Sequence, residues 1–559
     1  MTKIKTHYRT CNLCEAMCGV KIEHEGSKIL SIKGDENDPF SKGHICPKAI
    51  ALQDLYEDPD RLRKPLEKTA TGWKEISWKD AFKKAAKGLQ GIQQQHGQNA
   101  LGIYLGNPNT HNLGGSLTIK ELLNGFKTQN RYTATSVDQL PHHIIAHHLF
   151  GHQLRIPVPD INRTDYMLII GANPVASNGS IMTVAGVKDK LKDIKKRNGK
   201  VVVIDPRRTE TAQIASEHHF IKPGSDVLLL LAMTNEVFKQ KCVKPNRMLA
   251  LASGYEAIEA LVKNYNCEYA EQHTGIKAQV IKQLVKELSQ NPKAVIYGRM
   301  GVSVQEFGLL SQYLIMVLNI LLGNLDEEGG MMFPTPAADP VAASGPGYFA
   351  KKHSRVRNLP NFNGEFPVAT LADEILTPGE GQIKGMLCVA GNPVLSTPNG
   401  EKLDTALESV DFMVSVDCFL NETSRHANII LPPVSAIERD HYDLAFHNLA
   451  VHNTAKFSKG FYPEKGGKHD WQIFLNLVKH LDKKVPFAQK IMRKITLLNG
   501  PNFMLNVLLK RSAYKGVSLS ALKKAPHGID LGPLKSMFPK GLKTKDKHIH
   551  LNTEFYFSD

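Results

Sequence analysis

The sequence has 559 residues, of which 42% are hydrophobic and 22% charged. This composition is typical of a soluble globular protein. The length indicates several domains, because one hydrophobic core rarely serves so long a chain. No apolar run approaches the roughly 20 residues of a membrane-spanning helix, so we expect no membrane span. Neither a secretory leader nor paired arginines precede Cys11. We therefore expect a cytoplasmic protein without a disulfide framework. The formal net charge of +16 would suit a nucleic-acid partner, but no nucleic-acid motif accompanies it, and we expect none.

Four of the eight cysteines form a signature near the N-terminus. Cys11, Cys14, Cys18 and Cys46 follow the pattern C-x2-C-x3-C-x27-C, so three thiolates share one tight loop and the fourth stands on a distant turn. This arrangement is typical of a [4Fe–4S] cluster. A zinc site is the alternative, but zinc ligands usually come as two C-x2-4-C pairs. The other cysteines are scattered and are expected to be ordinary core or surface residues: Cys242, Cys267, Cys388 and Cys418.

The segment between the third and fourth cysteines predicts a β-hairpin that turns at Glu25-Gly26. Lys48 follows Cys46 by two residues. A lysine there could lie between the cluster and a second redox centre, where its charge would stabilise an anionic partner. Taken alone, an exposed lysine on a helix is the simpler interpretation.

Two buried parallel strands are predicted in the middle of the chain. Residues 165–171 and 199–204 are short apolar runs separated by a charged helical stretch, which is a Rossmann-like strand–helix–strand pattern. Asn173 and Asp205 follow these strands directly, at the edge where such sheets bind ligands. An acid there can accept hydrogen bonds from a ribose or a guanine edge. Because no G-x-G-x-x-G occurs, an ordinary NAD site is not supported.

Further strand-and-loop units follow the same pattern. Pro223-Gly224 marks a turn before an apolar helix that Asp226 opens, either as a helix cap or as a ligand contact. Residues 385–393 end in Gly391-Asn392-Pro393 and resemble the earlier loop at Gly171. Two Asn-Pro loops after buried strands predict two related nucleotide-binding halves.

These motifs together resemble those of the molybdopterin oxidoreductases, the DMSO-reductase family that includes formate dehydrogenases and nitrate reductases. The resemblance runs in order from Cys11 to about residue 455. It is carried by the cysteine spacing with Lys48, Gly171-Ala-Asn-Pro174, Asp205-Pro-Arg207, Lys222-Pro-Gly-Ser-Asp226, Gly323-Asn-Leu-Asp-Glu-Glu-Gly-Gly330, Gly391-Asn-Pro393, Asn421-Glu-Thr423 and Ala427-Asn-Ile-Ile-Leu-Pro432.

The resemblance implies a bis(molybdopterin guanine dinucleotide) cofactor that carries molybdenum or tungsten. The N-terminal cluster would exchange electrons with that metal through one pterin, with Lys48 between them. Two sets of residues would contact the dinucleotides on the two sides of the molecule: Gly171, Asn173, Pro174, Asp205, Arg207, Gly224 and Asp226 on one side, and Gly391, Asn392 and Asn421 on the other.

In this family the protein ligand to the metal stands on a loop before the Gly171 strand. Asp138 occupies the position where a cysteine usually stands, and a carboxylate is a hard oxygen donor that suits a high-valent metal. Ser136 is the second candidate. Asp138 could instead only cap the helix that opens at Pro141.

A run of histidines follows Asp138 and would lie beside the metal. His142 and His143 open the run, and we expect substrate contacts or proton relays there because histidine is a good general acid near pH 7. His143 and His147 are spaced i, i+4 and could bind zinc by themselves, although nothing else in the sequence supports a zinc site.

The predicted fold class is α/β: a small N-terminal [4Fe–4S] domain followed by two Rossmann-like domains, one inserted in the other. We expect the cluster domain at residues 1–65, one α/β domain at 66–137 and 326–480, and the inserted dinucleotide-binding domain at 138–325. Family members continue into a C-terminal domain that closes over both dinucleotides. We expect residues 481–559 to be a basic, solvated linker leading to that missing lid domain. Three explanations for the missing lid stay open: the gene is truncated, another chain supplies the lid, or the cofactor is held in a more open site.

The leading functional hypothesis is therefore a molybdenum-dependent oxidoreductase with a small-molecule substrate, two-electron chemistry at the metal and an electron-transfer protein or subunit as partner. An aspartate ligand favours oxygen-atom transfer over formate oxidation. Two alternatives stay open: a non-catalytic or truncated iron–sulfur subunit, and a lyase that resembles a hydratase.

Overall fold

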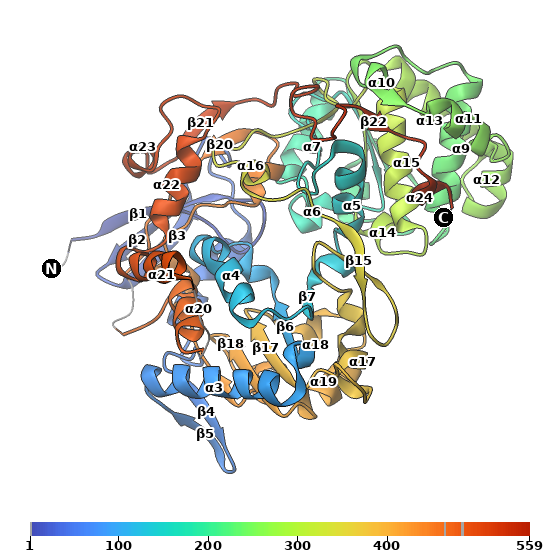
Figure 1. Cartoon of the computed structure of the whole chain (residues 1–559). Helices are drawn as coiled ribbons and strands as arrows, with labels where there is room; N and C mark the ends of the chain where they lie inside the picture. The colour runs from blue at the N-terminus through green and yellow to red at the C-terminus, as the bar shows by residue number, and fades with distance from the viewer. Residues whose placement is uncertain (1–2, 463–465, 482–485, 559) are drawn as a thin grey trace.

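The computed structural model describes residues 3–462, 466–481 and 486–558, and the chain forms a small N-terminal domain followed by two α/β domains (Figure 1). The N-terminal domain is built on a three-stranded antiparallel sheet. Its elements are β1 (Lys5–Thr10), β2 (Gly19–Glu25), β3 (Lys28–Gly34), α1 (Pro47–Ile50) and α2 (Leu52–Glu57). The strands β2 and β3 form the predicted hairpin, in which Glu25 lies opposite Lys28.

One glycine in this domain is required by a close approach of two turns. A Cβ atom on Gly34 would lie 1.9 Å from the carbonyl oxygen of Gly43, which no side chain could relieve because the obstacle is backbone. The turn that contains Gly43 leads directly to Cys46, so this contact fixes where the fourth cysteine stands.

The first α/β domain contains a seven-stranded sheet in the order β5-β4-β19-β18-β17-β6-β7. Its strands are β4 (Leu66–Thr69), β5 (Gly72–Glu75), β6 (Leu101–Leu105), β7 (Arg131–Thr133), β17 (Gly385–Val389), β18 (Phe412–Val416) and β19 (Ile429–Ile430). Helices cover both faces because the central strands are parallel and apolar on both sides. One face packs against α3 (Trp78–His96), α4 (Leu113–Phe126) and α20 (Asp470–Lys479), and the other against α17 (Leu371–Leu376) and α19 (Gly400–Glu408).

The second α/β domain contains a four-stranded parallel sheet in the order β11-β10-β9-β13. Its strands are β9 (Tyr166–Ile170), β10 (Lys200–Ile204), β11 (Glu217–His219) and β13 (Ala294–Gly298). Its main helices are α5 (Leu140–Phe150), α7 (Val187–Lys196), α9 (Asp226–Lys239), α11 (Tyr255–Val262), α12 (Cys267–Thr274), α13 (Ala278–Gln290) and α15 (Gly308–Leu321).

All strands of this second sheet lie in the chain between β7 and β17 of the first sheet. The second domain is therefore inserted in the first, which confirms the predicted fold class. Among the helices of the described ranges, none combines the length and the apolar character needed to cross a bilayer.

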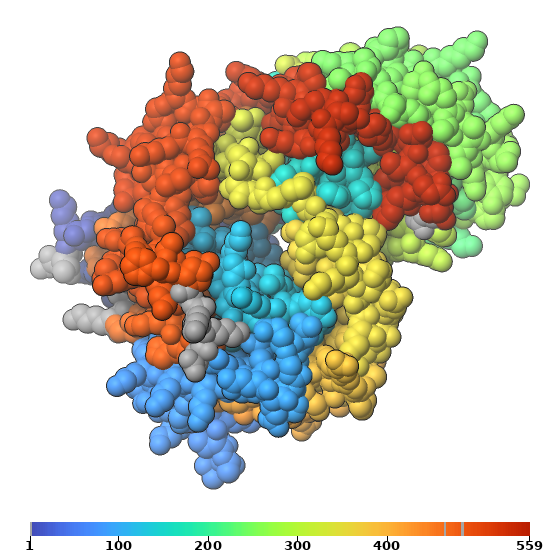
Figure 2. All heavy atoms as spheres, viewed as in Figure 1, coloured from blue at the N-terminus to red at the C-terminus, as the bar shows by residue number. Residues whose placement is uncertain are grey.

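The end of the chain forms a C-terminal strap, which we define as residues 486–558. It contains α21 (Phe487–Asn499), α22 (Asn502–Lys510), α23 (Leu519–Lys524), β21 (Ile529–Gly532), β22 (Ile549–His550) and α24 (Glu554–Phe557). The strand β21 pairs with β20 (Asn453–Ala455), and β22 pairs with β12 (Ala252–Ser253) of the second domain. Figure 2 shows the last residues, in red, lying across the second domain, in green.

The strap crosses between the two α/β domains, as a linker would, but its described residues are folded rather than solvated. Apolar side chains anchor it in the cores that it crosses, because Leu505, Phe538, Ile549 and Tyr556 are all buried there. The ring of Tyr556 stacks on Tyr313 at 4.1 Å. Residues 482–485 and 559 of the expected linker lie outside the described residues.

A buried carboxylate ties the strap to the second domain. Asp326 has a fully buried side chain that accepts hydrogen bonds from the backbone amides of Met537, at 2.9 Å, and Phe538, at 2.8 Å. The guanidinium of Arg247 lies 3.0 Å from the same carboxylate. Asp326 also adopts a left-handed backbone conformation, with φ +56°, which aspartate and asparagine tolerate better than most residues.

We therefore expect Asp326→Ala to loosen the strap at a cost of about 3 kcal/mol, since it leaves the amides of Met537 and Phe538 without their acceptor. Arg247 loses one carboxylate but keeps its bonds to the carbonyl of Phe538 and to Glu327. Hydrogen exchange at residues 537–551 should accelerate while exchange in β6 and β17 stays unchanged. Asp326→Asn keeps one acceptor oxygen and the backbone preference, so its effect should be smaller. Uniform exchange rates in wild type and Asp326→Ala would show that the strap is held by other contacts.

Candidate functional site

The four N-terminal cysteines converge at one end of the small sheet. Cys11 follows β1 and Cys18 precedes β2, and the amide of Cys11 donates to the carbonyl of Cys18 at 2.8 Å, which closes the loop that carries Cys14. Met17 in this loop has φ +48°, which gives the tight bend between the second and third cysteines. Cys46 stands directly before α1, so a second segment supplies the fourth thiol.

The thiols interact electrostatically, which places them near one another. Burial raises the pKa of Cys11 to about 11, and the neighbouring Cys14 and Cys46 add to the rise. Burial also raises the pKa of Cys18, and the other three cysteines raise it further. Four neighbouring thiolates, two of them buried and two half-buried, require strong positive charge, which iron supplies. The residues therefore fit a cluster.

Within the described ranges, no three His, Cys, Asp or Glu side chains converge tightly enough to hold a metal ion. A single tetrahedral ion needs its sulfur ligands about 2.3 Å from its centre. A cubane separates its four thiolates more widely, since each thiolate binds a different iron atom. The four cysteines of the N-terminal domain offer one thiolate for each iron atom of such a cubane.

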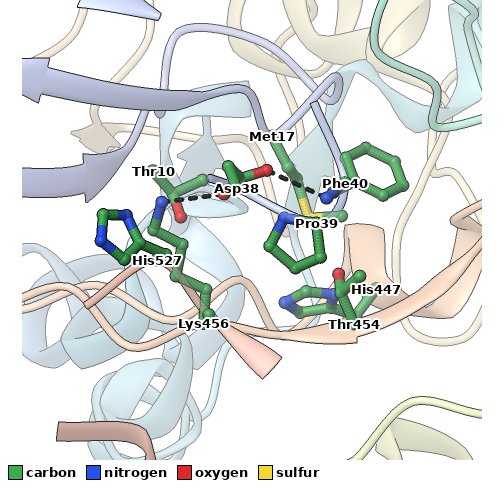
Figure 3. A pocket seen from close by; sticks show the side chains of 10 residues that line it. Thr10, Met17, Asp38, Pro39, Phe40, His447, Thr454, Lys456 and His527 are labelled. Atoms are coloured by element: carbon green, nitrogen blue, oxygen red, sulfur yellow. Dashed lines mark hydrogen bonds and ion pairs between the residues drawn. The ribbon is translucent and has the colours of Figure 1, made fainter. Parts of the chain in front are cut away.

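A buried ion-pair network supports the cluster loop from below (Figure 3). Lys456 lies 2.8 Å from Asp38 and 3.3 Å from Asp35, and His527 of the strap lies 2.9 Å from Asp35. Asp38 in turn accepts a hydrogen bond from the hydroxyl of Ser41. These residues were not predicted as part of the site, since no sequence pattern links Asp35 to positions more than 400 residues away.

Lys48 is exposed on α1, as the simpler interpretation had it, but its charge reaches the cluster site. Burial raises the pKa of Cys14, and the positive charge of Lys48 opposes that rise. The exposed ammonium group of Lys48 is therefore close enough to the second cysteine to affect its pKa.

Asp138 lies in a charged group that reaches the cluster loop. Its carboxylate is paired with the guanidinium of Arg299, which follows β13 directly. The side chain of Arg299 is 6% exposed and that of Asp138 is 39% exposed, so the carboxylate lies at the surface end of the pair. Glu15, the residue after Cys14, interacts with both charges and accepts a hydrogen bond from the amide of Ile181 at 2.9 Å.

The pKa of Glu15 reflects this position. The pKa of Glu15 is raised to about 7, mainly by burial and also by the charge of Asp138, against the lowering effects of the Ile181 amide and Arg299. The loop that binds the cluster thus carries a carboxyl group that senses the charge at Asp138. Neither Glu15 nor Arg299 was predicted, because both act through neighbours that are distant in the sequence.

The structure separates the alternatives that the sequence left open around Asp138. The residue that caps α5 is Gln139, and it makes no side-chain cap hydrogen bond, so Asp138 is not the cap of that helix. The hydroxyl of Ser136 accepts a hydrogen bond from the amide of Val368 at 3.0 Å. Asp138 therefore keeps its side chain at the surface end of the ion pair while Ser136 is engaged with the first domain.

The three predicted histidines occupy different surroundings. His143 donates from Nδ1 to the carbonyl oxygen of Gln153 at 2.9 Å, and His147 donates from Nδ1 to that of Pro346 at 3.0 Å. Among the described residues, no third His, Cys, Asp or Glu joins this pair to form a metal site. Burial lowers the pKa of both His142 and His143. His142 lines a small cavity of about 20 Å³ and its Nδ1 has no partner in the described structure. Only His143 of these two also interacts with the charge of Asp138.

The first set of predicted dinucleotide residues gathers at the carboxyl edge of the second sheet. Asp205 follows β10 and accepts a hydrogen bond from the amide of Arg207 at 2.8 Å. Asp226 opens α9, and burial raises its pKa, with a further rise from the charge of Asp205. Gln305 donates to Asp226 at 3.0 Å. Gly224 has φ +80° and open space where a side chain would be.

Asn173 holds its own loop in shape. Its side-chain amide donates to Glu210 at 2.7 Å, and its side-chain oxygen accepts from the hydroxyl of Thr211 at 2.7 Å. Pro174 begins the short helix α6 (Pro174–Ser177), where a proline fits because no amide is needed. Gly171, at the end of β9, has φ +54° and would bring a Cβ within 2.8 Å of the Val302 amide nitrogen.

The loop after β17 repeats this arrangement in the first sheet. The amide of Asn392 donates to Glu422 at 2.7 Å, and its oxygen accepts from the hydroxyl of Thr423 at 2.7 Å. The backbone angles of the two asparagines also agree, with φ −124° and ψ 68° at Asn173 against φ −119° and ψ 69° at Asn392. The two halves therefore carry the same loop with the same hydrogen bonds.

Two residues that were predicted to contact the second dinucleotide, Asn421 and Gly391, shape the local backbone. Asn421 uses its side-chain oxygen to accept from the amides of Thr423 and Ser424, at 3.0 and 2.9 Å, so it shapes the turn. A Cβ on Gly391 would lie 2.6 Å from the ring of Tyr104, so this glycine allows the loop to pack against β6. Glu422 and Thr423 belong to a motif that carried the family resemblance, whereas the matching pair Glu210-Thr211 was not predicted. The repeat of Asn-Pro-Val-x-Ser at 173–177 and 392–396, each followed by a Glu-Thr pair, is the sequence signal that would have found it.

Comparison with known proteins gives the family. Residues 61–480 match the molybdopterin oxidoreductase family, and residues 4–56 match the molybdopterin oxidoreductase Fe4S4 domain. The chain belongs to the molybdopterin oxidoreductase family. It is therefore a molybdopterin-dependent oxidoreductase with an N-terminal iron–sulfur domain, as its sequence motifs predicted.

Two relatives and one solved structure illustrate this membership. The chain is 24% identical to the thiosulfate reductase molybdopterin-containing subunit PhsA of Salmonella typhimurium, over 93% of this chain and 70% of that protein. It is 25% identical to the F420-dependent formate dehydrogenase subunit alpha of Methanocaldococcus jannaschii, over 86% of this chain and 70% of that protein. Acetylene hydratase from Pelobacter acetylenicus has the same fold, with a TM-score of 0.79 and 18% identity over 99% of this chain and 78% of that chain.

Proposed function

We propose that this member of the molybdopterin oxidoreductase family is a catalytic subunit that binds two molybdopterin guanine dinucleotides and one molybdenum or tungsten atom. Its reaction is a two-electron conversion of a small oxo-compound, with oxygen-atom transfer as the reaction class. Electrons pass singly through the [4Fe–4S] cluster to or from a partner protein or subunit. The chain acts in the cytoplasm, and a separate chain that supplies a lid over the cofactor is compatible with this function.

The observation that carries the proposal is the electrostatic interaction between Asp138 and Glu15 of the cluster loop. The Asp138 carboxylate lies at the surface end of its ion pair with Arg299, and Glu15 of the cluster loop interacts with both groups. A hard oxygen ligand for a high-valent metal therefore stands beside the segment that binds the iron–sulfur cluster. Electron exchange between two redox centres requires this kind of proximity.

Each residue of the group has a task that follows from its surroundings. When bound, the pterin-held metal supplies the two-electron chemistry. Arg299 is buried and orients the Asp138 carboxylate, which is the oxygen ligand in this proposal. Lys48 offers positive charge near Cys14, and in this proposal it lies between the cluster and one pterin. Burial lowers the pKa of His143, so its imidazole is neutral near pH 7 and can accept a proton from a nearby group.

Two equivalent loops support two dinucleotides of the same kind. The Asn173 and Asn392 loops share their hydrogen-bond pattern and lie at the carboxyl edges of two parallel sheets, where such folds bind nucleotides. Asp205 and Asp226 add carboxylates at the first of these edges, which is the chemistry that a guanine or ribose edge requires.

The test is the composition and turnover of the full chain purified without oxygen from its own host, so that partner chains are retained. We expect about four iron atoms and four sulfides per chain, one atom of molybdenum or tungsten, and guanine nucleotide released by acid. With reduced viologen as the electron donor, oxo-compounds such as nitrate should be consumed.

Two outcomes would overturn the proposal. Iron without molybdenum or tungsten, and without guanine nucleotide, would identify a non-catalytic iron–sulfur subunit. Product formation in the absence of any electron donor or acceptor would identify a lyase instead of a redox enzyme.

A further inference from the structure

The helix α21 exposes its apolar side chains to water. Phe487 is 78% exposed and Leu498 is 74% exposed, and these two residues mark the ends of one stripe along the helix. Ile491 and Ile495 lie between them, with the spacing i, i+4, i+8 and i+11 that places all four on one face. Met492 beside them is also exposed.

The opposite face of the same helix is the buried one, and it is polar. Arg493 is 8% exposed and is paired at 2.5 Å with Glu121 of α4. Thr496 is 1% exposed and donates to the carbonyl of Met492 at 2.9 Å. A surface helix of a globular protein normally turns its apolar face to the core. The ion pair to Glu121 holds α21 in the reverse orientation, so the apolar stripe is presented to the outside.

The segment of the chain that carries the stripe is basic. Residues 486–529 contain eight lysines and arginines and no aspartate or glutamate. Lys490 and Lys494 are exposed on α21 itself. Each follows an apolar residue of the stripe by three positions, Phe487 and Ile491 in turn, so both lysines lie along the edge of the stripe. On the neighbouring helix α22, Val507 is 47% exposed and Lys510 is also exposed.

We propose that α21 seats the protein on the surface of an anionic phospholipid bilayer. An amphipathic helix whose apolar residues are flanked by lysines lies in the interface plane, with the apolar side chains among the acyl chains and the ammonium groups at the phosphates. A protein partner fits less well, because lysine is depleted from the cores of protein interfaces. Here Lys490 and Lys494 lie directly beside the apolar residues. This inference does not rest on the redox chemistry of the chain.

The test is flotation of the full chain with vesicles of phosphatidylcholine and phosphatidylglycerol in a three-to-one ratio. We expect binding to these vesicles, weaker binding at high salt, and little binding to vesicles of phosphatidylcholine alone. The double variant Phe487→Ser/Leu498→Ser should bind about 30-fold more weakly, since it removes the two most exposed anchors. Circular dichroism checks that the variant is folded.

A control variant uses two other strongly exposed apolar residues. Ile4 and Phe220 are 61% and 62% exposed and lie away from α21 in the chain, so Ile4→Ser/Phe220→Ser should bind the vesicles as well as the wild type. Absence of binding to the anionic vesicles, or equal loss in both double variants, would overturn the proposal. A dimer, or a tightly bound protein partner, that disappears only in Phe487→Ser/Leu498→Ser would also overturn it, because the stripe would then be covered by protein.

Discussion

Cys46→Ser is expected to abolish the iron–sulfur cluster. Iron and acid-labile sulfide should fall from about four each per chain to less than about one-tenth of that amount, and the reduced protein should lose its cubane EPR signal. The reason is that three thiolates share one loop and the fourth comes only from Cys46, before α1. A serine hydroxyl there is a poor ligand for iron, and the remaining buried thiols repel one another when they ionise.

The control for this variant is another buried cysteine. Cys267 lies in the second α/β domain, and burial together with the charge of Glu236 raises its pKa to about 12. Cys267→Ser should therefore keep the full iron content. One zinc atom per chain in the wild type, with no sulfide, would show that the four cysteines hold a different metal and would end the cluster assignment.

The parallel strands were the most predictable part of the fold. The predicted strand at 165–171 is β9, the one at 199–204 is β10, and the one at 385–391 is β17. Strands that are buried on both faces must be apolar throughout, so they stand out as continuous runs that end at glycine or a polar loop. The N-terminal hairpin was predictable for a similar local reason, its turn at Glu25-Gly26.

The C-terminal strap was expected to be solvated because of its charge, and this expectation was wrong for its described residues. Its lysines suggested a solvated segment, but a few apolar residues spaced along it, such as Phe538, Ile549 and Tyr556, are buried in the core of the second domain. The anchoring contact at Asp326 joins residues 211 and 212 positions apart. Neither composition nor periodicity reports a contact of that range.

The charged group at Asp138 illustrates the same limit within the site. The resemblance to the family pointed to Asp138, but its partner Arg299 is 161 residues away, and Glu15 is joined to Ile181 across 166 residues. Arg299 follows β13, yet nothing local in the sequence distinguishes it from other arginines that follow strands. Only the folded chain shows that the cluster loop and the candidate ligand belong to one electrostatic group.

Asp138→Ala is expected to lower turnover by more than about 100-fold while iron, molybdenum or tungsten, and guanine nucleotide stay bound. Loss of a residue that only orients a ligand typically costs 10–100-fold, and loss of the ligand itself should cost more. X-ray absorption at the metal edge should show one fewer oxygen ligand in the variant. Ser136→Ala should keep its turnover, because the Ser136 hydroxyl is engaged with the amide of Val368.

A purely structural role for Asp138 makes a different prediction, since the carboxylate also neutralises the buried Arg299. Removing it would leave an unpaired guanidinium and lower stability for that reason alone. The double variant Asp138→Ala/Arg299→Met removes both charges and separates the two roles. If Asp138 is the metal ligand, the double variant recovers thermal stability but not turnover. If turnover recovers together with stability, Asp138 serves only to balance Arg299, and the ligand must come from another residue.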